Sequence, residues 1–347
     1  MMKFTKLCIV VLLISSLIMF AGCGTQEKPS DNQSTEANKE VEQNNEDKST
    51  VAEEYPTKDI TILCPYGPGG TDNFTRAISL SLTDIMGQTV VVNNVSGAAG
   101  SVGMTQFCKT PADGYTILTI STDLIINSAM KRSEYTHKDL IPIGRIQHDQ
   151  SMFWVNPDGP YKTMEDVIKY AKENPGKLNF GITSPAGFDE VLVSSFCDAA
   201  GIEANIIPFN SGSETMAALL GKHVDLMHEE PSSAMSVYES GKIKPVVVMT
   251  EERLPKFSDV PTAKELGYDV TLAIWRGAFV NKGTPVHIVK YLEDAFKKAF
   301  DDPQYKDIEE KSMLDQRPGY LNSEDFGKFL EEEFEIYSGA LKKLGYI

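Results

Sequence analysis

The segment Cys64–Asp72 has the sequence CPYGPGGTD. It follows an apolar run, Ile60–Cys64, and leads into the amphipathic segment Thr71–Ile85. This pattern predicts a strand that turns into a helix, with glycines where the backbone must turn tightly or come close to another group. The first N–H groups of a helix have no partner within it and carry partial positive charge, so they bind anions. We interpret this loop as a cradle for a carboxylate; a tight turn without a ligand is the alternative for this segment alone. The residues assigned to the cradle are Tyr66, Gly69, Gly70, Thr71 and Asp72.

A second segment repeats this arrangement. The predicted strand Thr89–Val92 leads into a run of small residues at positions 96–101, which opens another predicted helix. The loops after neighbouring parallel strands lie side by side at the carboxyl edge of a sheet, where open α/β folds bind ligands. Two such loops together favour an anion site. Its second half comprises Ser96, Gly97, Ala98, Ala99, Gly100 and Ser101.

Strands and helices alternate through much of the chain. Short apolar runs such as Tyr115–Ile120 and Leu178–Ile182 alternate with helix-like segments such as Phe188–Ala200. This order predicts an α/β protein with parallel sheets that are covered by helices on both faces. From Thr284 onward the strand signal fades and helices are expected. The helical C-terminal part is therefore predicted to pack on the first lobe.

Two segments have the character of crossings between lobes, Val155–Pro157 and Ala273–Trp275. Two lobes joined by paired strands form a hinge around a cleft that opens and closes. We therefore expect lobe 1 to comprise residues 55–154 plus 275–347, and lobe 2 to comprise residues 155–274.

The first 54 residues predict a lipoprotein. Lys3 and Lys6 precede the apolar run Leu7–Phe20, which is typical of a secretory signal and too short to span a bilayer. The following Ala21-Gly22-Cys23 resembles a bacterial lipobox, although Phe20 stands where leucine is usual; an ordinary signal peptide is the alternative. Residues 1–22 are thus the predicted signal peptide, and Cys23 is predicted to be lipidated. Residues 23–54 continue as a polar tether that is expected to be disordered.

The chain is strongly acidic, with a formal net charge of −16. This charge argues against nucleic acid as a partner, because nucleic acid is bound by basic surfaces. An anionic ligand would have to be captured by local hydrogen-bond donors against the overall field.

Several charged residues leave two interpretations open. Asp72 and Arg76 are one helical turn apart and are expected to form an ion pair, with a contact from Arg76 to ligand as the alternative. Arg276, at the second crossing, either holds a carboxylate across the cleft or braces the hinge against an acid. Glu229 and Glu230 are expected in a solvated loop; if either faces the cleft, it would instead hold an ammonium group.

The folded part of the chain resembles the substrate-binding proteins of tripartite tricarboxylate transporters, also called the Bug receptor family. No single motif decides this, but their shared order along the chain does. The motifs are Tyr55-Pro56, Pro65 with Gly69–Asp72 and Arg76, Ser96–Ser101, Asp113–Thr116, Asn174–Leu178, Pro208–Gly212, Gly221 with Asp225, Val260–Thr262, Glu265–Gly267 and Lys282–Pro285.

The resemblance implies a two-lobed, periplasmic-binding-protein-like fold of the Venus flytrap type, without cofactor or metal. It also implies that the two first-lobe loops hold a ligand carboxylate, largely through backbone N–H groups and ordered water. Two departures matter: the family's Gly/Ser-rich stretch is replaced at Thr183–Glu190, and Phe209-Asn210 stands where a tyrosine-lysine pair is common. The distal ligand group is therefore expected to differ from the family's usual ones. The second-lobe residues implied to contact ligand are Ser184, Phe188, Asn210, Ser211, Gly212 and Asp225.

Nothing in the sequence pairs a nucleophile with a base. Ser128–Lys131 fits a Ser-x-x-Lys pattern but lacks its partner motifs, and His223 and His228 would point to opposite faces of a strand. We therefore expect a monomeric receptor and not an enzyme. It would be lipid-anchored at the extracytoplasmic face of a bacterial membrane, and would deliver a di- or tricarboxylate, or a related organic acid, to membrane transporter components. A ligand-sensing receptor for a signalling partner and a hydrolase with an unrecognised site are the alternatives.

Overall fold

The computed structural model describes residues 54–183 and 185–347. The predicted signal peptide, Cys23, nearly all of the tether and Ser184 lie outside the described residues. Within the described ranges, no helix has the length and apolar character needed to cross a membrane.

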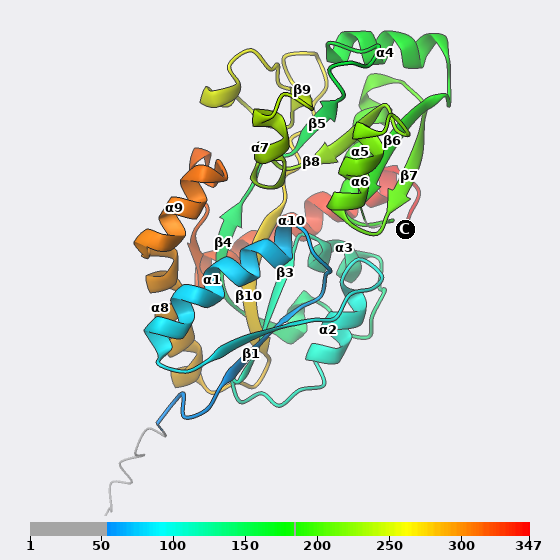
Figure 1. Ribbon diagram of the computed structural model, residues 1–347. Coiled ribbons are helices and arrows are strands. Elements are labelled where there is room, and N and C mark those ends of the chain that lie inside the picture. The colour runs from blue at the N-terminus through cyan, green and yellow to red at the C-terminus, as the bar shows by residue number, and fades with distance from the viewer. Residues whose placement is uncertain (1–53, 184) are drawn as a thin grey trace, which may run out of the picture. The chain divides into compact units, whose positions relative to one another are not determined.

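Six strands form the first sheet, in the order β11-β4-β10-β3-β1-β2 (Figure 1). β1 pairs in parallel with both β2 and β3, as the strand–helix–strand order predicts. The strands are β1 (Ile60–Cys64), β2 (Val90–Asn94), β3 (Thr116–Ser121), β4 (Leu140–His148), β10 (Trp275–Asn281) and β11 (Leu321–Asn322).

Five strands form the second sheet, in the order β7-β6-β8-β5-β9. The lobe boundary that was expected after residue 154 falls inside β5, so the first crossing precedes Met152. The strands are β5 (Met152–Val155), β6 (Leu178–Thr183), β7 (Ala204–Phe209), β8 (Leu226–Glu229) and β9 (Lys244–Val248).

Both sheets are mixed, so the prediction of wholly parallel sheets is wrong. β10 runs antiparallel to β3 and β4, and β5 runs antiparallel to β8 and β9. β4 leads the chain out of the first sheet toward β5, and β10 brings it back. The neighbouring strands β4 and β10 therefore run in opposite directions. The sequence pattern did not predict strand β4, because the polar residues Arg145 and Gln147 interrupt its apolar run. In the structure both of these side chains are buried.

Different helices cover the two faces of the first sheet. Ile60 and Ile62 pack toward α1 (Gly70–Met86) and α8 (Val286–Asp301). Leu63 lies on the opposite face, since successive strand residues alternate. That face is covered by α2 (Ser101–Phe107), α3 (Asp123–Ala129) and α10 (Ser323–Lys343), while α9 (Pro303–Lys311) packs beside α1 and α8. The C-terminal helices therefore cover the first sheet, as predicted.

The second sheet is sandwiched in the same way. Trp154 packs with the cluster that includes α6 (Gly212–Leu220) and α7 (Pro231–Glu239). Phe153 packs with the cluster on the other face, which includes α4 (Met164–Glu173) and α5 (Phe188–Ala200). The segments that connect the two sheets contact each other, because the N–H of Asp149 donates to the carbonyl of Ile274 over 2.9 Å.

The packing of α1 predicts a difference between two of its leucines. Leu82 is fully buried and Leu80 is 54 % exposed. Leu82→Ala is expected to lower the free energy of unfolding by about 2–5 kcal/mol, because it leaves a cavity in the core. The matched control Leu80→Ala should change it by less than about 0.5 kcal/mol. Urea unfolding of the full chain measures both, and equal losses would contradict this packing.

Candidate functional site

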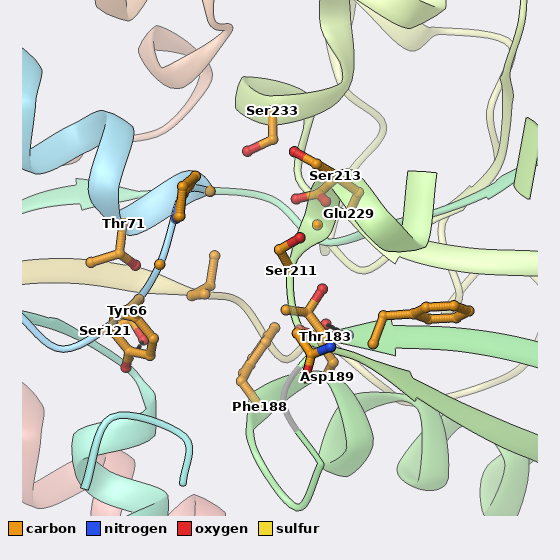
Figure 2. Close-up of a pocket in the computed structure, with 18 of the residues that line it drawn as sticks. Tyr66, Thr71, Ser121, Thr183, Phe188, Asp189, Ser211, Ser213, Glu229 and Ser233 are labelled. Atoms are coloured by element: carbon orange, nitrogen blue, oxygen red, sulfur yellow. Dashed lines mark hydrogen bonds between the residues drawn. The ribbon is translucent and has the colours of Figure 1, made fainter. Parts of the chain in front are cut away.

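A cavity of about 730 Å³ opens at the carboxyl ends of strands from both sheets. One wall comes from the segments after β1, β2 and β3, and the other from the segments after β6, β7 and β8. Figure 2 shows Thr71, Tyr66 and Ser121 facing Ser211 and Glu229 across this space. The cavity therefore lies where open α/β folds bind ligands.

Most of the residues predicted to contact ligand line this cavity. Further polar residues also line it, although no motif singled them out as ligand contacts; after β3 and β8 the glycine-rich signal is missing. The predicted residues in the lining are Tyr66, Gly69, Gly70, Thr71, Ser96, Gly97, Ala98, Ala99, Gly100, Phe188, Asn210, Ser211, Gly212 and Arg276, and the additional ones include Ser121, Asp123, Thr183, Asp189, His228 and Ser233.

Asp72 is not part of the cavity wall. Its Oδ2 accepts from Arg76 Nε over 3.0 Å, and its Oδ1 accepts from Asn94 Nδ2 over 2.8 Å. The carboxylate thus ties the start of α1 to the end of β2. This is the expected ion pair, and Arg76 is engaged in it.

Ser101 and Asp225 also lie outside the cavity wall. Ser101 is buried at the start of α2. Asp225 precedes β8, and its Oδ2 accepts from the N–H of Asn179 over 2.8 Å. Because the cavity lies at the other end of β8, the contact predicted for Asp225 is not brought to the site. Ser184 falls outside the described residues.

The helix α1 begins without a side-chain cap. Its N-cap residue is Gly69, and no side chain there accepts from the first N–H groups. In the described chain, no carbonyl accepts from the N–H groups of Gly70, Thr71 or Asp72. These donors and the helix dipole make this wall of the cavity positive.

The second loop has an unusual backbone. Gly97, Ala98, Ala99 and Gly100 all have positive φ, with values of 142°, 46°, 49° and 83°. For the two alanines this conformation is strained, and such strain gathers at binding sites. The N–H groups of Gly100 and Ser101 donate back to Gly97 and Ala98 within the loop, so fewer donors are open than expected.

Arg276 is 2 % exposed and lies between the start of α1 and the end of β8. Its Nη2 is 3.1 Å from Glu230 Oε2, its Nη1 is 3.6 Å from Asp149 Oδ2, and its Nε donates to Thr71 Oγ1 over 3.2 Å. Burial alone would raise the pKa of Glu230, but the Arg276 guanidinium holds that pKa below its usual value. These contacts favour the bracing role of Arg276 over a ligand-binding one.

Glu229 and Glu230 are 9 % and 4 % exposed and line the cavity, so the expectation of a solvated loop is wrong. Burial, together with the neighbouring carboxylates of Glu230 and Asp189, raises the pKa of Glu229 well above its usual value. Asp189 also pairs with His228, whose Nδ1 lies 3.0 Å from Asp189 Oδ1. The second wall is therefore acidic.

The buried acid Asp149 predicts a pH dependence of stability. Burial and then Glu230 raise its pKa to about 7, whereas an aspartate in an unfolded chain has a pKa of about 3.9. The folded state therefore binds a proton that the unfolded state releases. The stability from this proton is fully present below about pH 4 and is lost as the pH rises through about 7.

Asp149→Asn should flatten the decline in the free energy of unfolding between about pH 5 and pH 7 by up to about 1.4 kcal/mol per pH unit. Urea unfolding across this range measures the slope. The exposed Asp84→Asn is the control and should keep the slope of the unchanged protein. If the free energy of unfolding fell with the same slope in the unchanged protein, Asp149→Asn and Asp84→Asn, the raised pKa of Asp149 would be contradicted.

Comparison with known proteins places this architecture in one family. Residues 74–346 match the family described as "Tripartite tricarboxylate transporter family receptor". A UPF0065 protein in the gbd 5' region of Cupriavidus necator is 33% identical over 296 residues, which are 85% of this chain and 90% of that protein. The solved structure of a TctC solute binding protein from Polaromonas is 30% identical with a TM-score of 0.65, and the match covers 84% of this chain and 100% of that chain.

The periplasmic binding protein BugD has a similar structure, with a TM-score of 0.77 at 27% identity, over 84% of this chain and 99% of that chain. The family resemblance and the two-lobed fold inferred from the sequence are thereby confirmed. The chain belongs to the receptor family of tripartite tricarboxylate transporters, whose members are solute-binding receptors and not enzymes.

Proposed function

We propose that this receptor captures a small carboxylate-bearing solute in the cavity between its two sheets and delivers it to a membrane transporter of the tripartite type. The observation that carries the proposal is the uncapped start of α1 beside the loop at residues 96–100, both on one wall of a cavity of about 730 Å³. A cavity of this size suits a small organic molecule.

The ligand carboxylate is held by main-chain N–H groups. The N–H groups of Gly70 and Thr71 lack backbone acceptors in the described chain, as do those of Ala98 and Ala99 in the second loop. Arg276 is already paired with Glu230, so its charge is largely compensated within the protein. Local dipoles therefore supply the attraction in a chain whose net charge is −16.

Ligand binding is coupled to closure of two lobes, one built around the first sheet and the other around the second. Two contacts between these segments support the coupling: Arg276 pairs with Glu230, and the N–H of Phe188 donates to Asp123 Oδ1 over 2.8 Å. Ligand favours the closed form because only there do both walls contact it. The closed form then presents the surface that the transporter recognises.

The glycine at position 69 allows a test of the carboxylate site. A Cβ at Gly69 would meet no atom within 4 Å, whereas at Gly70 it would lie 2.2 Å from Arg276 Nη2. Gly69→Val should therefore fill the cavity beside the α1 start without disturbing the fold, and it should weaken carboxylate binding roughly tenfold or more, about 1.4 kcal/mol.

Native mass spectrometry of the freshly purified protein identifies a carried-over ligand, and calorimetry with mono-, di- and tricarboxylates gives the affinities. The control Gly339→Val lies on exposed α10, where an added Cβ also meets nothing. Its affinity should equal that of the unchanged protein. Normal binding by a folded Gly69→Val protein would refute the proposed carboxylate site.

The lipid anchor at Cys23 is part of the same proposal. Labelling of cells with an alkyne-bearing palmitate should mark the protein, because acyl chains join the cysteine that follows Ala21-Gly22. Cys23→Ser should abolish the label, and the control Cys108→Ser should keep it. A label that persists in Cys23→Ser, or that is absent from the unchanged protein, would contradict lipidation at this residue.

A further inference from the structure

We propose that the solute carries a cationic nitrogen as well as its carboxylate, and that the carboxylate of Glu229 binds this ammonium group. The inference rests on the proposed function and narrows the substrate class of the same cavity to small zwitterionic acids.

Glu229 is the starting observation. It is the last residue of β8, is 9 % exposed and lines the cavity. Its main-chain carbonyl accepts from Trp154 Nε1 over 2.8 Å, and its carboxyl group lies within hydrogen-bond reach of the carboxyl group of Glu230. Two neighbouring acids repel each other when both are ionised, so a cationic group of a ligand beside them would be attracted.

Neighbouring atoms on the same wall lack partners. In the described chain, His228 Nε2 and Ser233 Oγ are buried without a hydrogen bond, and both residues line the cavity. His228 itself is 2 % exposed. Figure 2 shows Glu229 close to Ser211 and Ser213, with Ser233 at the edge of the same wall. This wall therefore presents two unused hydrogen-bonding atoms near the acidic pair Glu229 and Glu230.

The balance of charge in the cavity favours a solute that carries a cationic group over a purely anionic one. Of the described lining residues, Arg276 is the one with a lysine or arginine side chain, and Glu230 compensates it, while His228 pairs with Asp189. Asp123 and Glu229 add further acidic groups. A second ligand carboxylate would face these acids, whereas an ammonium group would be attracted to Glu229 while the first wall holds the single carboxylate.

Binding of such a solute should release a proton. Burial, Glu230 and Asp189 raise the pKa of Glu229 well above its usual value, so Glu229 takes up a proton more readily than an exposed glutamate does. The charged groups around it are Glu230, Asp189, Arg276 and, beside Asp189, His228. A bound ammonium group favours the ionised carboxylate and lowers that pKa again, which releases the proton to solvent.

Calorimetry of the purified full chain with matched pairs of acids tests the inference. The pairs are propionate and alanine, succinate and aspartate, glutarate and glutamate, and 3-phenylpropionate and phenylalanine, each with and without an α-ammonium group. In at least one pair the ammonium member should bind roughly tenfold or more tightly than its partner. Titration of that member in phosphate and in Tris should give different apparent enthalpies, from which proton release follows.

Glu229→Gln keeps the shape of the side chain and removes its charge. The preference for the ammonium member and the proton release should both disappear, while the affinity for the matched acid stays unchanged or improves. The control Glu239→Gln is exposed on α7 outside the cavity lining and should behave as the unchanged protein. Thermal unfolding shows whether each variant folds. If Glu229→Gln does not fold, the matched pairs of acids still test the inference on the unchanged protein.

The outcomes separate this inference from the proposed function. Binding of the simple acids with equal or greater affinity than their ammonium partners would overturn the inference and leave a carboxylate receptor. A preference that survives in folded Glu229→Gln would also overturn it. Binding of none of the eight probes, together with no carried-over carboxylate in mass spectrometry, would overturn both.

Discussion

The buried ion pair between Arg276 and Glu230 is the interaction on which the rest of the site depends. It joins a strand of the first sheet to the end of β8 in the second, with 3.1 Å between Nη2 and Oε2. The guanidinium lies against the start of α1 so closely that Gly70 must have no side chain there. Loss of one partner of a buried pair costs about 3–5 kcal/mol, because the other charge stays buried and uncompensated. The pair therefore fixes the geometry of both cavity walls.

This pairing also decides how the cavity can treat a solute. Because Arg276 is compensated by Glu230, the donors left for an incoming carboxylate on the first wall are its N–H groups. The second wall carries Glu229 beside Glu230, and this neighbour raises the pKa of Glu229. The two walls thus differ in the sign of their electrostatic potential, and the positive potential of the first wall comes from main-chain N–H groups. Such a cavity can orient a solute by its dipole.

Local patterns predicted the parts of the site that are built locally. The glycines after β1 and β2 place main-chain donors at helix starts, and Tyr66 to Thr71 line the cavity as expected. The burial of Glu230 was misjudged because it depends on Arg276, which is distant in sequence. The predicted ligand contact of Asp225 was wrong, because the sequence of a strand does not show which of its two ends lies at the cavity. The antiparallel pairing of β4 with β10 likewise depends on where the chain returns between the sheets.

Closure of the lobes uses the same chemistry as capture of the solute. Glu230 from the second wall reaches Arg276 and the start of α1, while Asp123 from the first wall accepts from the N–H of Phe188 at the start of α5. In both contacts a protein carboxylate lies against the positive start of a helix. A solute shifts the equilibrium toward the closed form only through binding energy that it gains there and not in the open form. It gains that energy if it contacts both walls, which is why we propose a solute with one charge at each end.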